Sequence, residues 1–585
     1  MSGDTLTYDM AMMSEGSPQV FVKRDWLSLQ DQQNGNYGGN QLVLDTSQLA
    51  NSNKYADYRN AYLTVPMIMA MSSPSDANQI SMLTTTGGTF KEGVTQVPSL
   101  KNWFGSIVSS MLLDYAGTTI IQNTPLCGLF STFTLMTSLS RSDIETLGPT
   151  IGFYPDSVNF RYDSTEDGTK SGNGCCNNSK VIAQGSLEKK AGSSEFSNSG
   201  IQQRWSRLMI DADGLSAQAG ESFDSIVQAG KMDQLYRSRV ADSQVEASKH
   251  AFVIYQIQAF IYLRHLHSFF SQIPLLKGVF FRLTLNLNQP VVTVESNAND
   301  TIRIKDIISP LGGVSPLMIS SQEGPATSVG AAQAGWGLNL VAGKEMRVTL
   351  NVGTRIIDTT QNTACDNATI ALNNSCFLHV PLFTFNPAFE SAYLSRPTKT
   401  IVYSDLYQYT TAEVKATGQF NYLITNGISN IKSVLVLPME SKIGGGLAQD
   451  YPPFWSPFDT CGGGTTAPLG GSSLTNFNVV VAGQNMVYNQ VQRSHEEFQQ
   501  QLYGTNAVNA GLTDGLTSGL VDYWSFLQQY GYYYVNCARQ LPIDEAVPKS
   551  VSIQGTSQSS KALKLYVFIE YGVQVNVDVL TGARV

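Results

Sequence analysis

The five histidines are the side chains of this chain best suited to proton transfer or metal binding, because an imidazole titrates near neutral pH. They are His250, His265, His267, His379 and His495. His265 and His267 form an H-x-H pair, which could bind one metal ion if the segment were a strand. The surrounding sequence LRHLHSFF favours a helix, in which side chains two positions apart diverge by about 200°. We therefore expect no metal at this pair.

Other sequence patterns of cofactor and catalytic sites are incomplete. HEEF at 495 lacks the second His of the H-E-x-x-H zinc motif and is better explained as the charged start of a helix. GGGTTAPLGG (462–471) lacks the Lys-Ser or Lys-Thr of a P-loop, and GWGLNL (335–340) has only the first two glycines of a dinucleotide fingerprint. No G-x-S-x-G elbow of a serine hydrolase occurs. We expect both glycine-rich segments to be turns, and we expect no cofactor.

Paired carboxylates for glycoside cleavage remain an open alternative, because the fold sets their spacing. The candidates are Asp405, Glu413, Asp459 and Asp522. Acidic residues on loops are usually solvated, so the expectation is that the chain has no catalytic residues and is not an enzyme.

The cysteines do not form a recognisable metal or disulfide pattern. They lie at positions 127, 175, 176, 365, 376, 461 and 537, without a C-x-x-C spacing. We expect free thiols in a reducing compartment. Sequons at Asn177, Asn299, Asn367 and Asn373 matter only in a secreted protein. The sequence opens without the positive and apolar regions of a secretory signal, so secretion is not expected.

Composition points to a large β-protein with little surface charge. The chain has 585 residues, which predicts at least two domains, and only 14% of them are charged, against roughly 25% in an ordinary globular protein. Such a surface suits either a neutral β-protein or a subunit covered by neighbours. The net charge is −9, without a basic stripe, so no specific nucleic-acid binding is expected. The apolar run 251–263 is too short to span a bilayer.

Alternating apolar and polar residues predict strands along the whole chain. The clearest runs are 279–287, 63–71, 348–352 and 563–579, the last with Gly572 as a bulge or bend. Helical patterns are few and short: 100–117, 142–147 with a capping box from Ser142 to Glu145, 263–272, 495–504 and 519–531. Strands with short helices in their loops indicate an all-β chain of sandwiches rather than an α/β sheet.

The chain divides into an arm and two halves of similar size. Residues 1–17 form an acidic N-terminal arm, and a change of pattern near 289–304 places the domain boundary there. The first sandwich is then 18–290, with a long loop at about 155–250, and the second is 300–582. No convincing internal repeat supports a duplication.

The segment IPLLKGVFFRLTLNLNQ (273–289) resembles the closing strands of the first jelly roll in double jelly-roll major capsid proteins, which VFVKRDWLSLQDQQNG (20–35) would begin. The chain is most similar to those of virophages and Polinton-like viruses. HVPLFTFNPAFESAYLSRPTKTIVYSDLYQY (379–409) resembles the first strands of the second jelly roll. The remaining segments keep the family's order of strands, loop and helix: 420–439, 451–460, 474–490, 495–502 and 515–539.

This resemblance implies two consecutive eight-stranded jelly rolls with short helices in the loops. It also implies a structural protein whose homotrimers form pseudo-hexameric capsomers in the icosahedral shell of a double-stranded DNA virus. The expected partners are neighbouring capsomers, penton proteins and minor capsid proteins, and the expected location is the virion, after synthesis in the infected host cell. The alternative is a secreted jelly-roll protein that binds or cleaves glycans. Contact with a membrane and the role of residues 1–17 stay open, although an arm that grips a neighbour is one hypothesis.

Overall fold

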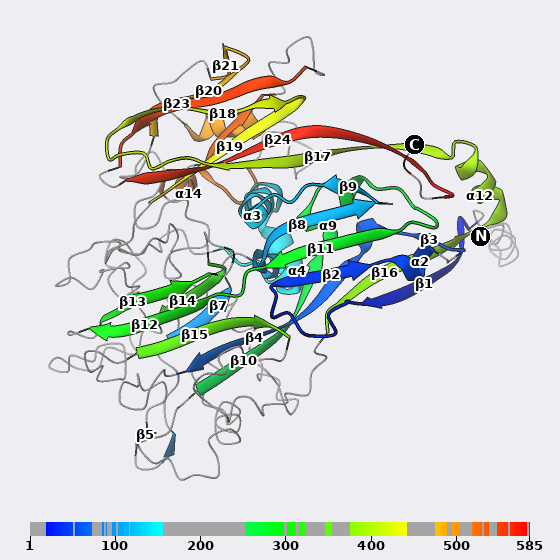
Figure 1. Ribbon diagram of the computed structural model, residues 1–585, viewed down its shortest axis with the longest axis horizontal. Coiled ribbons are helices and arrows are strands. Elements are labelled where there is room, and N and C mark those ends of the chain that lie inside the picture. Colours follow the sequence, from blue (N-terminus) through cyan, green and yellow to red (C-terminus); the bar gives the residue numbers. More distant parts are fainter. Residues whose placement is uncertain are drawn as a thin grey trace, which may run out of the picture.

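The computed structural model contains two antiparallel β-sandwiches (Figure 1). The sandwich of the C-terminal part of the chain, coloured yellow to red, lies above the sandwich of the N-terminal part, and helix α3 (Cys127–Ser138) lies between them. The structure describes residues 19–50, 53–72, 85–86, 89–90, 96–100, 103–115, 117–155, 252–297, 301–309, 311, 315–321, 345–353, 375–440, 474–487, 494–502, 518–528, 530, 532–537, 547–559, 562–581 and 584.

The C-terminal sandwich consists of two sheets of four strands each. One sheet has the order β17 (Thr398–Thr410), β24 (Leu563–Asp578), β19 (Ile431–Glu440), β22 (Tyr533–Asn536). The other has the order β18 (Gln419–Ile428), β23 (Lys549–Ser557), β20 (Leu474–Val481), β21 (Gln484–Asn485). If the strands are lettered B to I along the chain, these sheets read B-I-D-G and C-H-E-F, which is the jelly-roll order.

The N-terminal sandwich repeats this order. Its first sheet contains β1 (Phe21–Gln30), β16 (Phe377–Phe385), β4 (Tyr62–Ser72) and β10 (Phe252–Tyr262). Its second contains β2 (Gln41–Asp45), β11 (Phe281–Leu287), β8 (Val108–Tyr115) and β9 (Thr118–Ile121). The chain is therefore an all-β protein built of two consecutive eight-stranded jelly rolls, as its sequence predicts.

Insertions extend the N-terminal sandwich. Strands β12 (Val291–Asn297), β13 (Thr301–Ile308) and β15 (Glu345–Val352) lengthen its first sheet, where β15 pairs with the far end of β4. The smaller elements are β3 (Tyr55–Ala56), β5 (Thr85–Thr86), β6 (Thr89–Phe90), β7 (Gln96–Leu100), β14 (Leu317–Ser321), α2 (Ser47–Ala50) and the 3-10 helices η1 (Tyr58–Asn60) and η3 (Phe104–Ile107).

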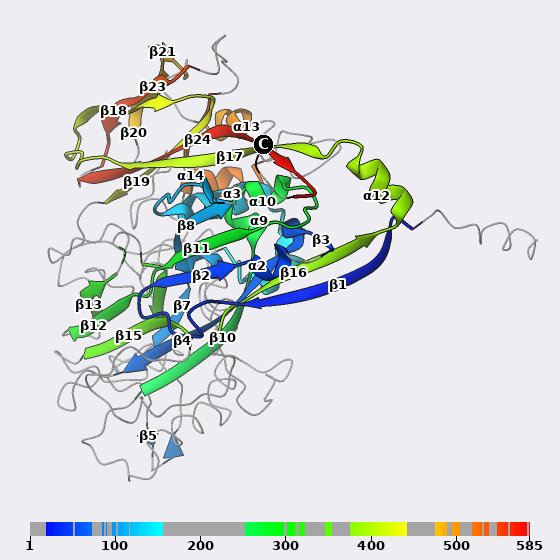
Figure 2. The ribbon, with the colours of Figure 1, turned by 45° about the vertical axis from the view of Figure 1, so that its right-hand side comes forward.

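Strand β16 belongs by its hydrogen bonds to the N-terminal sandwich, because it pairs with β1 and with the start of β4. The expected boundary at 290–300 does not coincide with this pairing, and the segment 379–409 begins with the last strand of the first jelly roll rather than with the second. Helix α12 (Pro387–Leu394) connects β16 to β17 (Figure 2). We therefore propose that the sandwiches divide at 386–397 and that 291–353 is an insertion before the last strand.

The helix expected at 100–117 is wrong. The segment forms the end of β7, then η3, then strand β8, which lies between β11 and β9 in its sheet. Six of the eight β8 residues are buried, because α3 covers the sheet on the side away from the sandwich interior. A strand that is buried on both faces has no apolar and polar alternation and cannot be distinguished from a helix by its pattern.

The other expected helices are present but differ in extent. The segment 263–272 forms two single turns, α9 (Leu263–Leu266) and α10 (Phe269–Gln272). Helix α4 (Arg141–Ile151) begins one residue before the expected range, and its capping box joins Ser140 and Asp143 rather than Ser142 and Glu145. Helix α13 (His495–Leu502) confirms the expectation at 495–504, and α14 (Tyr523–Gln528) covers part of 519–531.

The sheet of β17, β24, β19 and β22 is buried on both faces and joins the sandwiches. Val434, Val436 and Val567 point into the interior of the C-terminal sandwich. Leu435 and Phe568, which alternate with them, pack into the other core, which continues through α3 into the N-terminal sandwich. Burial of both faces explains the unbroken apolar runs 434–437 in β19 and 565–569 in β24.

Candidate functional site at the junction of the two sandwiches

The junction combines an aromatic layer with a group of buried polar side chains. In the aromatic layer, the Phe133 ring of α3 lies 5.0 Å from the ring of Tyr532 and 5.2 Å from that of Tyr534. Phe130 of the same helix lies 6.1 Å from Phe568 of β24. Edge and tilted contacts of this kind add to the apolar burial and fix how the two bodies are oriented.

His267 lies at the centre of the polar group, between the single turns α9 and α10. Its backbone is extended, with φ −154° and ψ 141°, so it interrupts the helix expected there. The ring nitrogen Nδ1 accepts a hydrogen bond from the backbone N–H of Phe269 at 3.2 Å. Because Nδ1 accepts, the ring proton of neutral His267 is on Nε2, which lies 3.3 Å from Oδ1 of Asp405 and donates to it.

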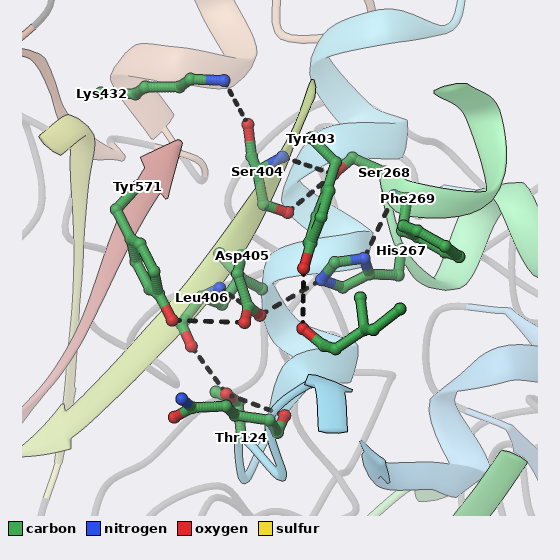
Figure 3. A network of polar contacts seen from close by, with 12 residues as sticks. Thr124, His267, Ser268, Phe269, Tyr403, Ser404, Asp405, Leu406, Lys432 and Tyr571 are labelled. Carbon is green, nitrogen blue, oxygen red and sulfur yellow. Dashed lines mark hydrogen bonds and ion pairs between the residues drawn. The ribbon is translucent and has the colours of Figure 1, made fainter. Parts of the chain in front are cut away.

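Asp405 of β17 is the acceptor on which the polar group converges (Figure 3). Only 2% of this residue is exposed. Besides the hydrogen bond from His267, Asp405 accepts one from the Tyr571 hydroxyl at 3.2 Å and one from the backbone N–H of Leu406 at 2.8 Å. Burial, and after it the negative charge of Asp405, raise the pKa of Tyr571, so the phenol keeps its proton and donates.

Further hydrogen bonds connect the N-terminal sandwich to β17 around this centre. The Ser268 hydroxyl donates to the carbonyl of Ser404 at 2.7 Å and accepts its N–H at 3.0 Å. Tyr403 donates to the carbonyl of Ile120 at 2.8 Å, and Thr124 donates to that of Leu406 at 2.7 Å. The edge of β17 is thereby paired with side chains of the other sandwich, which aligns the two bodies (Figure 3).

A cavity of about 340 Å³ lies beside the polar group. Its lining comes from α3, α9, α10, β17, β22 and β24. The charged side chains and histidines among the lining residues are Arg264, His265, His267 and Glu570. Glu570 accepts a hydrogen bond from Ser433 at 2.8 Å. Burial, and to a smaller extent the charge of Arg264, lower the pKa of His265 to about 4, so this imidazole is neutral near pH 7.

The geometry of His267 suits a structural role. A histidine that acts as a general base needs a free ring nitrogen facing the reacting group. Both nitrogens of His267 are engaged, one with a backbone N–H and the other with Asp405. No cluster of three or more potential metal ligands occurs among the described residues.

The remaining candidate residues are dispersed. Glu413 is exposed beyond the end of β17, and Asp522 is exposed and accepts the backbone N–H of Ser525 at the start of α14. His495 donates through Nε2 to the carbonyl of Val521 at 3.0 Å, in agreement with a structural helix start. His379 lies on the outer face of β16 between Ser28 and Thr64, and burial lowers its pKa.

Cys127, Cys376 and Cys537 are free thiols, as expected. The other predicted residues and segments lie outside the described residues: His250, Asp459, Asn177, Asn299, Asn367, Asn373, Cys175, Cys176, Cys365, Cys461, residues 1–17, 335–340 and 462–471, and the 155–250 loop apart from its first residue. In the part of the chain that is described, no helix is long and apolar enough to cross a membrane.

Single sequence motifs do not predict the Asp405 group, because its members are far apart in the sequence. Asp405 is among the acidic candidates predicted from the sequence, whereas Tyr571, Ser268 and Thr124 are not. The one available signal is an acidic residue at an inward position of an apolar strand, which requires buried partners.

Comparison with known proteins gives likenesses to viral capsid structures. One is the 3.5 Å cryo-EM structure of the Sputnik virophage, with a TM-score of 0.43 and 10% identity, over 97% of this chain and 89% of that one. Another is the major capsid protein of mavirus, with a TM-score of 0.43 and 10% identity, over 97% and 91%. The Faustovirus major capsid protein has a TM-score of 0.42 and 11% identity, over 96% and 91%. Identities this low concern the fold alone. No family model and no curated protein sequence matches the chain.

Proposed function

We propose that this chain is the major capsid protein of a double-stranded DNA virus, and that three copies form a pseudo-hexameric capsomer of an icosahedral shell. The observation that carries the proposal is the presence of two complete jelly rolls with the same strand order in one chain. Three such chains around a threefold axis present six similar lobes, and a nearly hexagonal block can tile a closed shell. The sequence resemblance to double jelly-roll capsid proteins supports the same role.

The junction supports a function that depends on shape. The aromatic layer and the Asp405 group join the sandwiches through buried contacts, so the two lobes have one fixed orientation. A tile requires this property, because lobes that moved independently would not meet neighbouring tiles in a constant geometry.

The surface also suits a protein that is covered by neighbours. Large apolar side chains are exposed on strands of both sandwiches, including Val22 at 65%, Trp26 at 50%, Val402 at 54% and Leu423 at 60%. Burial of such side chains against other subunits stabilises assemblies, and charged groups would be costly to desolvate there. In this role the chain is part of the virion, contacts neighbouring capsomers, penton proteins and minor capsid proteins, and is not an enzyme.

The test is the assembly state of the purified protein. Light scattering after gel filtration should give the mass of a trimer, and electron micrographs of concentrated protein should show hexagonal blocks, sheets or shells. A protein that stays monomeric at high concentration and forms no particles would refute the proposal.

The second candidate, a protein that binds or cleaves glycans, has less support. Glycoside cleavage requires two carboxyl groups across one site. Of the residues that line the 340 Å³ cavity, Glu570 alone is acidic. Glycan-array binding and turnover of polysaccharides by the same preparation would test this candidate directly.

A further inference from the structure

Strand β1 has an open hydrogen-bonding edge. It is the terminal strand of its sheet and pairs along its whole length with β16, and no strand among the described residues pairs with its other edge. The strand has ten residues. A long open edge is a template for pairing with another segment, and natural proteins usually protect such edges.

The outer face of β1 exposes large apolar side chains, whereas a solvent-exposed strand face is usually polar. Leu27 and Leu29 face the core, so Trp26 next to them faces outward and is 50% exposed. Val22, at the irregularity between Phe21 and Lys23, is 65% exposed. The Trp26 ring lies 5.8 Å from the ring of Tyr62 on β4. We name the outward side chains Val22, Arg24, Trp26 and Tyr62 the β1 face.

The start of β1 carries excess positive charge, with Arg24 on the β1 face and with Lys23 and Lys54 beside Asp25 on the opposite face of the strand. The Arg24 guanidinium lies 5.5 Å from the centre of the Trp26 ring and forms no ion pair with a carboxylate in the part of the chain that the structure describes. Lys23 and Lys54 share the single carboxylate of Asp25. Three cations and one carboxylate therefore lie at the start of this strand, so an acidic, partly apolar segment would match it.

Residues 1–18 have the composition that this surface requires. They contain Asp4, Asp9 and Glu15 and no Lys or Arg. Leu6, Tyr8, Met10 and Met12 recur at every second position, which is the period of a strand with one apolar face. Eighteen extended residues reach about 60 Å, enough to cross from one subunit onto the next.

We propose that residues 5–13 of one copy of this chain add as a β-strand to the open edge of β1 in a neighbouring copy. Leu6, Tyr8, Met10 and Met12 then cover the β1 face, and Asp9 lies near the cations. This proposal rests on the proposed function, in which copies are neighbours. Where each arm contacts the next subunit in one direction, the contacts close into a ring if the copies are related by a symmetry axis, such as the threefold axis of the proposed capsomer.

The start of β1 favours exchange between copies over a return onto the same strand. The Val20 carbonyl accepts the backbone N–H of Asn386 at 2.9 Å, so the chain is still attached to the β16 side when it leaves the sheet. A tight hairpin back to the open edge would need a turn at 14–20, where Pro18 has no N–H to donate.

The first experiment measures binding of the arm to the strand. A fluorescent peptide of residues 1–18 is titrated into protein that lacks these residues, and its anisotropy is followed. Saturable binding of one peptide per chain is expected, with an affinity at least about tenfold lower for the double variant Val22→Ser, Trp26→Ser. The matched control is Leu423→Ser, which removes an equally exposed side chain from the other sandwich and should leave the affinity unchanged. All variants are first compared by circular dichroism and melting temperature. Absence of binding, or equal affinity for all variants, would overturn the proposal.

A second experiment determines whether the arm binds between copies. A photocrosslinking amino acid replaces Tyr8, and copies with natural and heavy nitrogen are mixed before illumination. Crosslinks that join light to heavy peptides at β1 are expected, whereas crosslinks only within one isotope would overturn exchange. The two proposals can fail separately. Trimers without peptide binding refute the arm, and peptide binding by a protein that forms no trimers refutes the capsomer.

Discussion

Replacement of Asp405 by alanine tests the claim that the polar group holds the sandwiches together. The substitution leaves three buried donors without their acceptor: Nε2–H of His267, the Tyr571 hydroxyl and the Leu406 N–H. Each buried unsatisfied donor costs about 1–3 kcal/mol. Two effects offset part of this destabilisation: the variant no longer has to bury a carboxylate, and water from the adjacent 340 Å³ cavity can accept from the freed donors. We expect Asp405→Ala to lower the free energy of unfolding by about 3 kcal/mol.

Asp405→Asn should cost less, about 1 kcal/mol, because its amide oxygen can still accept from Leu406 and His267. The matched control is Glu413→Ala, which removes an exposed carboxylate just beyond β17 and should change stability by less than about 0.5 kcal/mol. A double-mutant cycle with Tyr571→Phe completes the series. Loss of the Tyr571 hydroxyl should cost about 1 kcal/mol in the native chain and little once Asp405 is alanine.

The assay is urea unfolding, followed by both tryptophan fluorescence and far-ultraviolet circular dichroism, because a two-sandwich chain can unfold in more than one step. A loss below about 1 kcal/mol for Asp405→Ala, or additive effects in the cycle with Tyr571, would refute the structural role assigned to this group.

Three further predictions follow from the described contacts. Gly519 and Gly483 both have positive φ, +65° and +80°. An added Cβ would lie 2.5 Å from the Thr137 backbone at Gly519, but would meet nothing within 4 Å at Gly483. Gly519→Ala should therefore lower the urea midpoint clearly more than Gly483→Ala, and equal effects would contradict the close approach at Gly519. Burial lowers the pKa of His265 from 6.5 to about 4, so the unfolded chain takes up the imidazole proton at a higher pH than the folded chain. The free energy of unfolding should therefore fall by up to roughly 3 kcal/mol as the pH drops from 6.5 towards 4. His265→Gln should weaken this pH dependence, and an unchanged pH profile would argue against a buried neutral imidazole. Asp31 accepts hydrogen bonds from the Tyr37 hydroxyl at 3.0 Å and from the Cys376 N–H at 3.1 Å, which joins the β1–β2 turn to the start of β16. In urea unfolding, Asp31→Ala should lower the free energy of unfolding by about 2–3 kcal/mol and Tyr37→Phe by about 1 kcal/mol. A larger loss for Tyr37→Phe would show that the carboxylate is not the common acceptor.

Strands with one solvated face could be predicted from the sequence. The alternation at 279–287 appears in β11, where Phe281, Leu283, Leu285 and Leu287 are at most 3% exposed and Arg282 between them is exposed. The odd residues fill the sandwich core, as expected. The bulge expected at Gly572 lies instead in β19, where the register shifts between Ile431 and Ser433, whereas Gly572 pairs regularly with Ser404 of β17. An added Cβ at Gly572 would lie 2.2 Å from the Asn430 side chain, so a close approach explains the glycine.

The predictions failed where burial on both faces removes the periodic signal. Strand β8 has buried residues at nearly every position and therefore has the composition of an apolar helix. The single face expected for 563–579 is also incomplete. Leu565, Val567 and Ile569 enter the core of the C-terminal sandwich, whereas Val575 and Val577 of the same parity enter the other core. Strand twist over this length turns one row of side chains from one core to the other.

The membership of β16 could not be read from local sequence, because pairing joins residues that are far apart. Strand β16 pairs with β1, whose partner residues such as Ser28 and His379 are separated by 351 positions. The insertion 291–353 places four strands, β12 to β15, before it, and a change of local pattern at that insertion resembles a domain boundary. In this sandwich the first strand, β1, pairs with the last strand, β16, so the sandwich is complete only after every insertion between them. The end of the domain is therefore determined by strand pairing rather than by local composition. Strand β1 has an open edge for the same reason, because β16 pairs with one of its edges and no strand in the described part of the chain pairs with the other, which is therefore a site where we propose that a second chain binds.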